Sequence, residues 1–265
     1  MDIKKINQII QKSGNHFHYK VVEFLRENDW YVIVSPYYSD NFTNKPREID
    51  IIAEKEYRIE NFGDYVGSIN VRFFIECKYI TAETVFWFDD KDISSALERV
   101  LSDTPLEDPN RWSMTKEHRY LENTKVAKLF VTETNKNPDN EVMYKAISQS
   151  LNSMIYYRNR PSFLPTNSHK SRDIMTFLYY PLVVCNSFDN FWKYDTINKN
   201  EPEQIDDNFQ LEIRYAYFDE DKKSKNEYFL LDVLAFDKFK QFIKKLETKD
   251  VAAVRKKLLW KSISS

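Results

Sequence analysis

The sequence predicts a single α/β domain with a mixed central β-sheet flanked by helices. Segments with a helical spacing of apolar residues alternate with short apolar runs that are typical of strands. The chain has 265 residues, of which 42% are hydrophobic, and this is ample for one continuous core. We expect a core over about 1–185 and an α+β C-terminal extension over about 186–265, within one domain spanning 1–265.

Composition disfavours several classes of protein. Only three glycines occur, which argues against glycine-rich phosphate loops and hence against nucleotide hydrolases. The two cysteines, Cys77 and Cys185, are too few for a disulfide framework and form no zinc-binding pattern. Neither a signal peptide nor a membrane-spanning segment is apparent. We therefore expect a soluble, cytoplasmic protein with no membrane partner.

The net charge of −2 lacks the global sign of a nucleic-acid-binding protein, so any such surface must be local. Residues 238–261 hold nine Lys and Arg against two acids, although a solvated helix face explains this equally well. Further basic candidates lie in two connections and are accompanied by two tryptophans that could stack on bases. They are Arg111, Lys116, His118, Arg119, Lys125, Arg158, Arg160, Lys170, Arg172, Trp87 and Trp112.

The order of the expected elements begins with one helix over about residues 2–28, whose apolar stripe includes Phe17, Val21 and Leu25. A polar loop is expected over residues 158–173. Strand 175–185 is expected beside strand 126–132, and the intervening helix would join them as a right-handed crossover. The remaining expected strands are 30–36, 47–55, 69–80, 209–218 and 227–234, and the remaining helices are 92–101, 140–157 and one that begins at 236.

A hairpin between strands 47–55 and 69–80 decides where the charged residues lie. Gly63 is the natural turn residue between the two strands, so the numbers of facing residues should sum to about 126. In this register Asp50 opposes Glu76, and Glu48 opposes Lys78. A shift by one residue would move Asp50 to the other face of the sheet.

The alternate positions of the same two strands are apolar and should face the core. This pattern supports the register, because it leaves the four charged side chains together on the opposite face. The apolar residues are Ile49, Ile51, Ala53, Phe73, Ile75 and Cys77.

An acid followed two residues later by lysine is by itself a weak motif, since five other such pairs occur in the chain. Context distinguishes IECK at 75–78, which ends a strongly apolar strand and follows the acidic strand REID at 47–50.

Two opposed carboxylates suit the hydrolysis of phosphodiesters, which needs a divalent cation to neutralise charge and to activate water. Asp50 and Glu76 are the expected Mg²⁺ ligands, with the Cys77 carbonyl as a further ligand. Lys78 would orient or deprotonate the water or stabilise the transition state. The alternative is a cross-strand salt bridge between Glu48 and Lys78, although Asp50 and Glu76 then repel each other without a cation.

REID followed by IECK, after a helix and a strand, resembles the PD-(D/E)xK, or restriction-endonuclease-like, nucleases, including the bacterial restriction and phage-defence branches. The resemblance covers residues 15–160, and the order helix, strand, strand, strand, helix, strand matches that fold. It implies an endonuclease that cuts DNA with Mg²⁺, for which Mn²⁺ can substitute, and that uses Asp50, Glu76 and Lys78.

The first helix departs from the family pattern. Many relatives carry a glutamate there, whereas this chain has His18 at the matching position, and Glu23 projects elsewhere. His18 is either a ligand or a structural histidine, and Glu48 can supply the missing carboxylate. Gln149 resembles a polar helix residue that approaches the site in some relatives, or it is a solvated glutamine.

Two other functions stay open. A nuclease-like scaffold or nucleic-acid-binding subunit could keep the fold without the chemistry, and RNA could be the substrate. A chain of this length that cuts both strands is expected to need a homodimer partner or another subunit of a defence complex.

Overall fold

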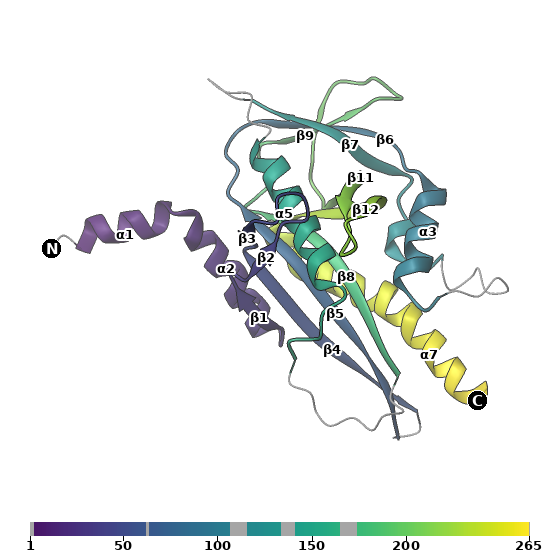
Figure 1. The fold of residues 1–265 in the computed structure, drawn as a ribbon. Coiled ribbons are helices and arrows are strands. Elements are labelled where there is room, and N and C mark those ends of the chain that lie inside the picture. Colours follow the sequence, from purple (N-terminus) through teal and green to yellow (C-terminus); the bar gives the residue numbers. More distant parts are fainter. Residues whose placement is uncertain (1–2, 62–63, 107–115, 134–140, 165–173, 265) are drawn as a thin grey trace.

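A computed structural model describes residues 3–61, 64–106, 116–133, 141–164 and 174–264. A ten-stranded mixed sheet has helices on both faces, which confirms the predicted α/β class (Figure 1). The helices are α1 (Ile3–Lys12), α2 (Gly14–Glu27), α3 (Ile93–Asp103), α5 (Glu141–Tyr157), α6 (Phe239–Leu246) and α7 (Ala252–Ser264), with short turns η1 (Arg119–Leu121), η2 (Phe236–Lys238) and η3 (Glu247–Val251).

The strands match most of the predicted segments, but four short or irregular ones were not predicted: β2, β6, β9 and β10. In chain order the strands are β1 (Tyr31–Val34), β2 (Tyr37–Ser39), β3 (Pro46–Glu48), β4 (Ile51–Asn61), β5 (Asp64–Lys78), β6 (Thr84–Asp90), β7 (Lys125–Thr132), β8 (Ile174–Cys185), β9 (Phe191–Asp195), β10 (Glu203–Gln204), β11 (Phe209–Phe218) and β12 (Ser224–Ala235). No described helix is long and apolar enough to cross a membrane.

The order of strands in the sheet is β1-β4-β5-β8-β12-β11-β7-β6-β9-β10, while β2 and β3 form a separate pair. β8 lies between β5 and β12, so the prediction that it neighbours β7 is wrong. The chain after residue 185 returns to the middle of the sheet, where β12 pairs with β8 and β11 pairs with β7. The last eight residues of β12 are almost entirely apolar and buried, as a strand covered on both faces requires.

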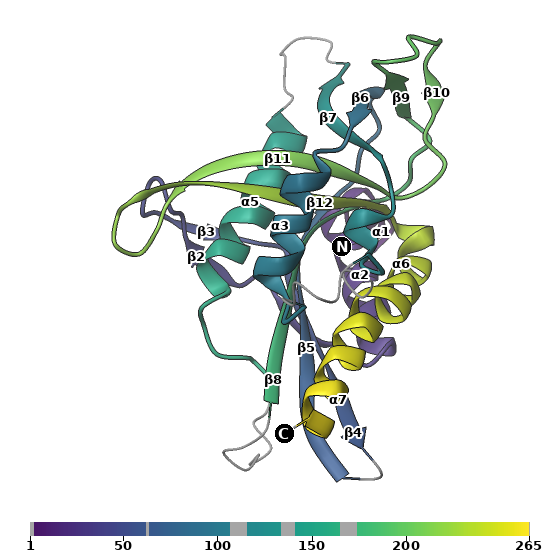
Figure 2. The same cartoon turned by 90° about the vertical axis from the view of Figure 1, so that its right-hand side faces the viewer.

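The opening helix is two helices rather than one. Ser13 has an extended backbone with φ −77° and ψ 141°, and it separates α1 from α2. α2 contributes Phe17, Val21 and Leu25 to a core cluster on one face of the sheet, together with residues of α6 and α7. α5 packs on the other face (Figure 2).

The hairpin register between β4 and β5 agrees with the prediction. Ile51 pairs with Ile75, and the same register continues to Ile59 and Gly67, where an irregularity follows. Gly63 lies outside the described residues. β4 begins only at Ile51, however, because the preceding strand β3 belongs to the second sheet, where Glu48 pairs with Tyr37. The predicted pairing of Glu48 with Lys78 is therefore wrong.

Both faces of this hairpin are buried, not only the predicted apolar one. Ile51, Ala53, Phe73 and Ile75 pack in the α2 cluster, with the partly buried Cys77 against it, as expected. The alternate residues Ile52 and Phe74 pack under α5, and so does Ile49, which was predicted on the α2 face. The bend at position 50 explains the change of face at Ile49.

Two charges lie deep on the α5 face of the hairpin. Arg72 and Glu54 are 0% and 1% exposed and are hydrogen-bonded to each other. Arg72 also donates to the carbonyls of Tyr157 and Pro161, while Glu54 accepts from the Ser162 hydroxyl and from two backbone amides. The pair thereby fastens the segment after α5 to the sheet.

We expect the substitution Arg72→Met to lower the free energy of unfolding by about 3–5 kcal/mol, because it leaves the buried Glu54 carboxylate without its cation. Urea denaturation followed by circular dichroism measures the change. The control is Arg214→Ala, which removes an ion pair with Asp92. The Arg214 side chain is 62% exposed, so this variant should lose less than about 1 kcal/mol of the free energy of unfolding. Equal losses in the two variants would contradict a stabilising role for the buried pair.

Candidate active site at the start of β4 and the end of β5

Asp50 lies at the bend between β3 and β4. Its carbonyl accepts from the Ser35 amide at 2.8 Å, and the Ile49 amide donates to the Pro36 carbonyl at 3.1 Å. Ser35 itself has φ 53°, a left-handed conformation that turns the chain out of β1. These bonds fix Asp50 beside the last residues of β5.

The three predicted residues of the motif come together. The Cys77 amide donates to Asp50 Oδ2 at 2.7 Å, and the Asp50 amide donates to Glu76 Oε1 at 3.3 Å. Lys78 Nζ donates to Glu76 Oε2 at 2.9 Å. Asp50 therefore holds its place opposite Glu76 through two backbone amides, and Lys78 lies on the same face, as its spacing predicts.

The electrostatics of the group are unusual for a carboxylate paired with lysine. Glu76 is 0% exposed, and burial followed by the charge of Asp50 raises its pKa to about 8, despite the opposing effect of Lys78. Burial lowers the pKa of Lys78, but Glu76 and Asp50 outweigh it, so the pKa of the lysine ends above its ordinary value. Lys78 is thus a cation near neutral pH, whereas Glu76 holds a proton.

The residues suit a hard divalent cation. Mg²⁺ is usually bound by one or two carboxylates with water completing its shell, and Asp50 and Glu76 provide two adjacent carboxylates. Burial and, after it, the charge of Asp50 raise the pKa of Glu76, and a bound cation would stabilise its charged form. Within the described ranges no group of three or more His, Cys, Asp or Glu side chains could hold a metal, so water or backbone oxygens would have to supply the remaining ligands.

Cys77 contributes through its backbone rather than its sulfur. Its amide fixes Asp50, and burial raises the pKa of its thiol well above the ordinary value, so that it stays protonated. Metal binding by its carbonyl stays a prediction.

Gln149 contacts the backbone of Glu48 and not the carboxylates of Asp50 and Glu76. Gln149 Nε2 donates to the backbone carbonyl of Glu48 at 2.9 Å, which ties α5 to the strand that leads into Asp50. Gln149 is therefore not a freely solvated glutamine. Among the described contacts, none joins the Glu48 carboxylate to Glu76 or Lys78.

His18 is a partly buried residue of α2. No described hydrogen bond joins it to the carboxylates, and its buried Nε2 has no partner among the described residues. A catalytic or ligand role for His18 stays a prediction.

Tyr38 is a further buried residue near the group, although no described hydrogen bond joins its side chain to Asp50, Glu76 or Lys78. It is 2% exposed, and burial, then Asp40, then Glu76 raise the pKa of its hydroxyl above the ordinary value. The influence of Glu76 places Tyr38 within electrostatic range of the carboxylates. No local pattern indicates this position, because β2 lies in the segment 37–46 between the expected strands 30–36 and 47–55.

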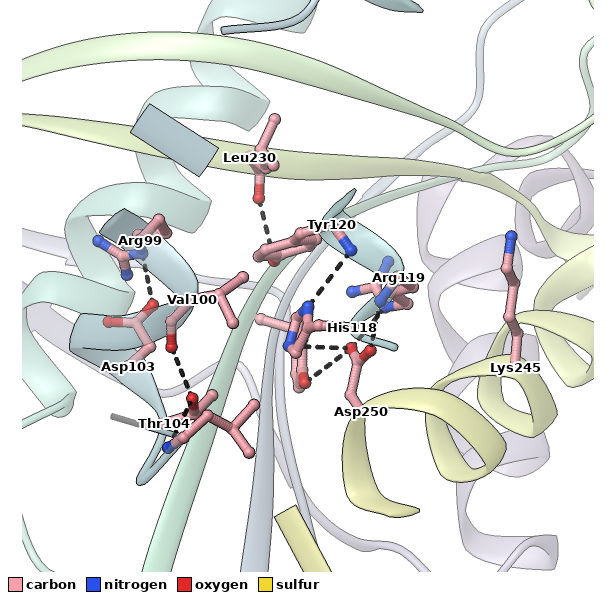
Figure 3. A network of polar contacts seen from close by, with 12 residues as sticks. Arg99, Val100, Asp103, Thr104, His118, Arg119, Tyr120, Leu230, Lys245 and Asp250 are labelled. Atoms are coloured by element: carbon pink, nitrogen blue, oxygen red, sulfur yellow. Dashed lines mark hydrogen bonds and ion pairs between the residues drawn. The ribbon is translucent and has the colours of Figure 1, made fainter. Parts of the chain in front are cut away.

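Two expected nucleic-acid contacts are buried, so that expectation was wrong for them. Arg119 binds both oxygens of Asp232 at 2.6 and 2.7 Å and Asp250 at 2.9 Å. His118 lies 3.5 Å from Asp250, and burial lowers its pKa although Asp250 opposes this. Figure 3 shows both side chains directed at Asp250, inside the protein.

The remaining basic and tryptophan candidates have different surroundings. Lys125 pairs with Asp90 and Asp195, and Arg158 pairs with Glu227. Lys116 and Arg160 are exposed. The partly buried Trp87 packs edge-on against Tyr194. Arg111, Trp112, Lys170 and Arg172 lie outside the described residues.

Comparisons of the chain with protein-family models, with curated proteins and with solved structures found no match.

The protonation of Glu76 predicts how stability depends on pH. The folded state binds this proton more tightly than the unfolded chain, so without metal the wild-type protein should lose stability as the pH rises from about 4.5 to about 8. At about 1.4 kcal/mol per pKa unit the loss reaches up to about 5 kcal/mol. Glu76→Gln should lack this loss in urea denaturation with EDTA at pH 5 and pH 9.

Lys223→Gln is the control for charge, because Lys223 is 71% exposed and lies outside the site. It should follow the wild-type pH dependence. If Glu76→Gln also loses stability in parallel with the wild type, the raised pKa of Glu76 is contradicted.

Proposed function

We propose that this chain is a metal-dependent endonuclease of the PD-(D/E)xK type that hydrolyses phosphodiester bonds in DNA. The observation that carries the proposal is the convergence of Asp50, the fully buried Glu76 and Lys78 at one point. Burying a carboxylate beside a second one destabilises the fold, and nucleases use that arrangement to bind a cation.

The arrangement of elements around the site supports the proposal. α2, β1, β4, β5, α5 and β8 follow the order helix, strand, strand, strand, helix, strand, with β2, β3, β6, α3 and β7 inserted between them and with β8 beyond the residues 15–160 of the resemblance. β1, β4 and β5 are antiparallel neighbours, and β8 lies parallel to β5. α2 and α5 cover opposite faces of these strands. A restriction-endonuclease-like core is therefore part of the proposal.

Each residue has a role that follows from its surroundings. Asp50 and Glu76 would hold Mg²⁺ or Mn²⁺, which when bound polarises the phosphate and lowers the pKa of water. Lys78 is protonated near neutral pH, so it stabilises negative charge on the phosphate rather than removing a proton. Cys77 and Gln149 position the carboxylates through backbone contacts.

The biological setting belongs to the same proposal. The chain would act in the cytoplasm in a bacterial restriction or phage-defence context, and cutting both strands would require a homodimer or a partner subunit, because one chain carries one such group. The competing function is a nuclease-like scaffold that binds nucleic acid without cutting it. It is favoured by His18, which replaces the usual glutamate.

Cleavage tests the proposal most directly. Purified protein with Mg²⁺ should cut DNA, and Lys78→Ala should reduce the rate by at least about 100-fold, since it removes a charge that stabilises the transition state. Gel analysis of plasmid, linear and single-stranded DNA and of RNA measures the rate and identifies the substrate.

Lys223→Ala is a matched control, because Lys223 also follows an acid by two residues, Asp221, but both are exposed. It should cut at the wild-type rate. Equal cleavage by wild type and Lys78→Ala would exclude this site as the catalytic centre.

Metal binding separates the nuclease from the silent scaffold. Mg²⁺ or Mn²⁺ should raise the melting temperature of the wild type and not that of Asp50→Asn, since a ligand that binds only the folded state stabilises it. The affinity should rise up to tenfold per pH unit between about pH 5 and pH 8, because binding must displace the proton of Glu76. The absence of any metal-dependent shift in the wild type would favour the scaffold.

A further inference from the structure

A cavity of about 670 Å³ lies among three elements that are far apart in the sequence. Its walls come from the loop after β2, the end of α5 and the turn between β11 and β12. Figure 2 shows the β11–β12 hairpin extending to the same side of the molecule as β2 and β3. The volume is in the range of small-ligand sites.

Two phenylalanines line the cavity and remain exposed. Phe42 is 50% exposed and Phe218 is 44% exposed, and their rings meet edge to face with centroids 6.0 Å apart. The loop that carries Phe42 is held in place by Asp40, whose carboxylate accepts from the amides of Phe42 and Thr43. Fixed aromatic rings that stay open to water are suited to stacking on a planar ligand.

A polar group in the same wall has no partner. The Nδ2 atom of Asn41 is buried and forms no hydrogen bond within the part of the chain that the structure describes. A buried donor without an acceptor costs about 1–3 kcal/mol, so it points to a ligand with an acceptor atom. The oxygens and ring nitrogens of a nucleobase are acceptors of this kind.

Two cations in the cavity wall have no described ion pair and could contact phosphates. Arg158 is held by Glu227, and Asp219 accepts from the Lys223 amide and pairs with Lys225. Arg160 lies 4.2 Å above the Tyr156 ring and forms no ion pair that is described, and Lys222 likewise has none. Glu220 and Asp40 also line the cavity, and neither has a described ion pair, so two cations and two acids remain there.

The cavity is connected to the candidate site by two rigid elements. Tyr38, within electrostatic range of Glu76, is followed by Ser39, Asp40 and Asn41 in the cavity wall. Along α5, Gln149 and the cavity residue Tyr156 are seven residues apart, or roughly 10 Å at 1.5 Å per residue. That rise separates the contact of α5 with the strand before Asp50 from the cavity wall.

We propose that this cavity binds an unpaired nucleotide of the nucleic-acid strand that enters the candidate site. Its base stacks on Phe42 and Phe218 and accepts a hydrogen bond from Asn41, while Arg160 and Lys222 contact the neighbouring phosphates. A base inside a duplex cannot reach such rings, so the substrate is single-stranded or unpaired at this position. The inference rests on the proposed function for its choice of nucleic acid as ligand.

Binding of a labelled single-stranded DNA of twelve mixed nucleotides, measured by fluorescence anisotropy in EDTA, tests the cavity without the metal site. The double variant Phe42→Leu with Phe218→Leu keeps apolar packing but loses both rings, and should bind roughly 5- to 100-fold more weakly. The control is Tyr19→Leu, a 54% exposed aromatic on α2, which should bind like the wild type.

An oligomer of the same length without bases should bind the wild type as weakly as the mixed DNA binds the double variant. Arg160→Gln and Lys222→Gln should each lower the slope of log K against log salt by about 0.7. Thermal unfolding verifies that each variant is folded. Equal binding of the mixed DNA by the wild type and the folded double variant, or no binding by the wild type, would overturn the proposal.

The two proposals fail in different ways. Lys78→Ala leaves the cavity unchanged and should weaken binding of the labelled DNA less than the double variant does, because it removes one phosphate contact and no stacking ring. Unchanged cleavage by Lys78→Ala, together with weak binding by the double variant, would remove the proposed catalytic site and keep the cavity. Loss of cleavage in Lys78→Ala, with unchanged binding by the double variant, would keep the proposed catalytic site and remove the cavity.

Discussion

The register between β4 and β5 is the constraint on which the rest of the candidate site depends. It brings the start of one strand opposite the end of the other, so that Asp50 and Glu76 share one point. Since side chains alternate along a strand, a shift by one residue would separate the two carboxylates. The bend at Asp50 then frees its backbone from the ladder and turns its carboxylate toward the Cys77 amide.

Burial on both faces gives this point its electrostatic character. β5 lies inside the sheet, with α2 on one face and α5 on the other, so every charge on it must be compensated. Arg72 and Glu54 achieve this as a pair with further hydrogen bonds. Among the described residues Glu76 has one nearby cation, Lys78, against burial and Asp50, and its pKa rises. The difference between these two carboxylates distinguishes a structural pair from a group suited to binding a cation.

The helix α5 links the carboxylates to the neighbouring cavity. Its middle holds the strand before Asp50 through Gln149, and its last turn forms a wall of the cavity through Tyr156. A rigid helix keeps the distance between the two places constant. A nucleic-acid strand that lies along α5 would contact both.

The sequence by itself determined the β4–β5 register, the convergence of Asp50, Glu76 and Lys78, and the class of the fold, because turn residues and alternating apolar positions are local signals. The tertiary structure alone decided that β12 lies between β8 and β11, since an apolar strand does not encode its neighbours. It also decided that Glu48 leaves the hairpin, that Arg119 is buried and that Tyr38 lies near Glu76. These features depend on contacts between segments distant in the chain, which no local pattern records.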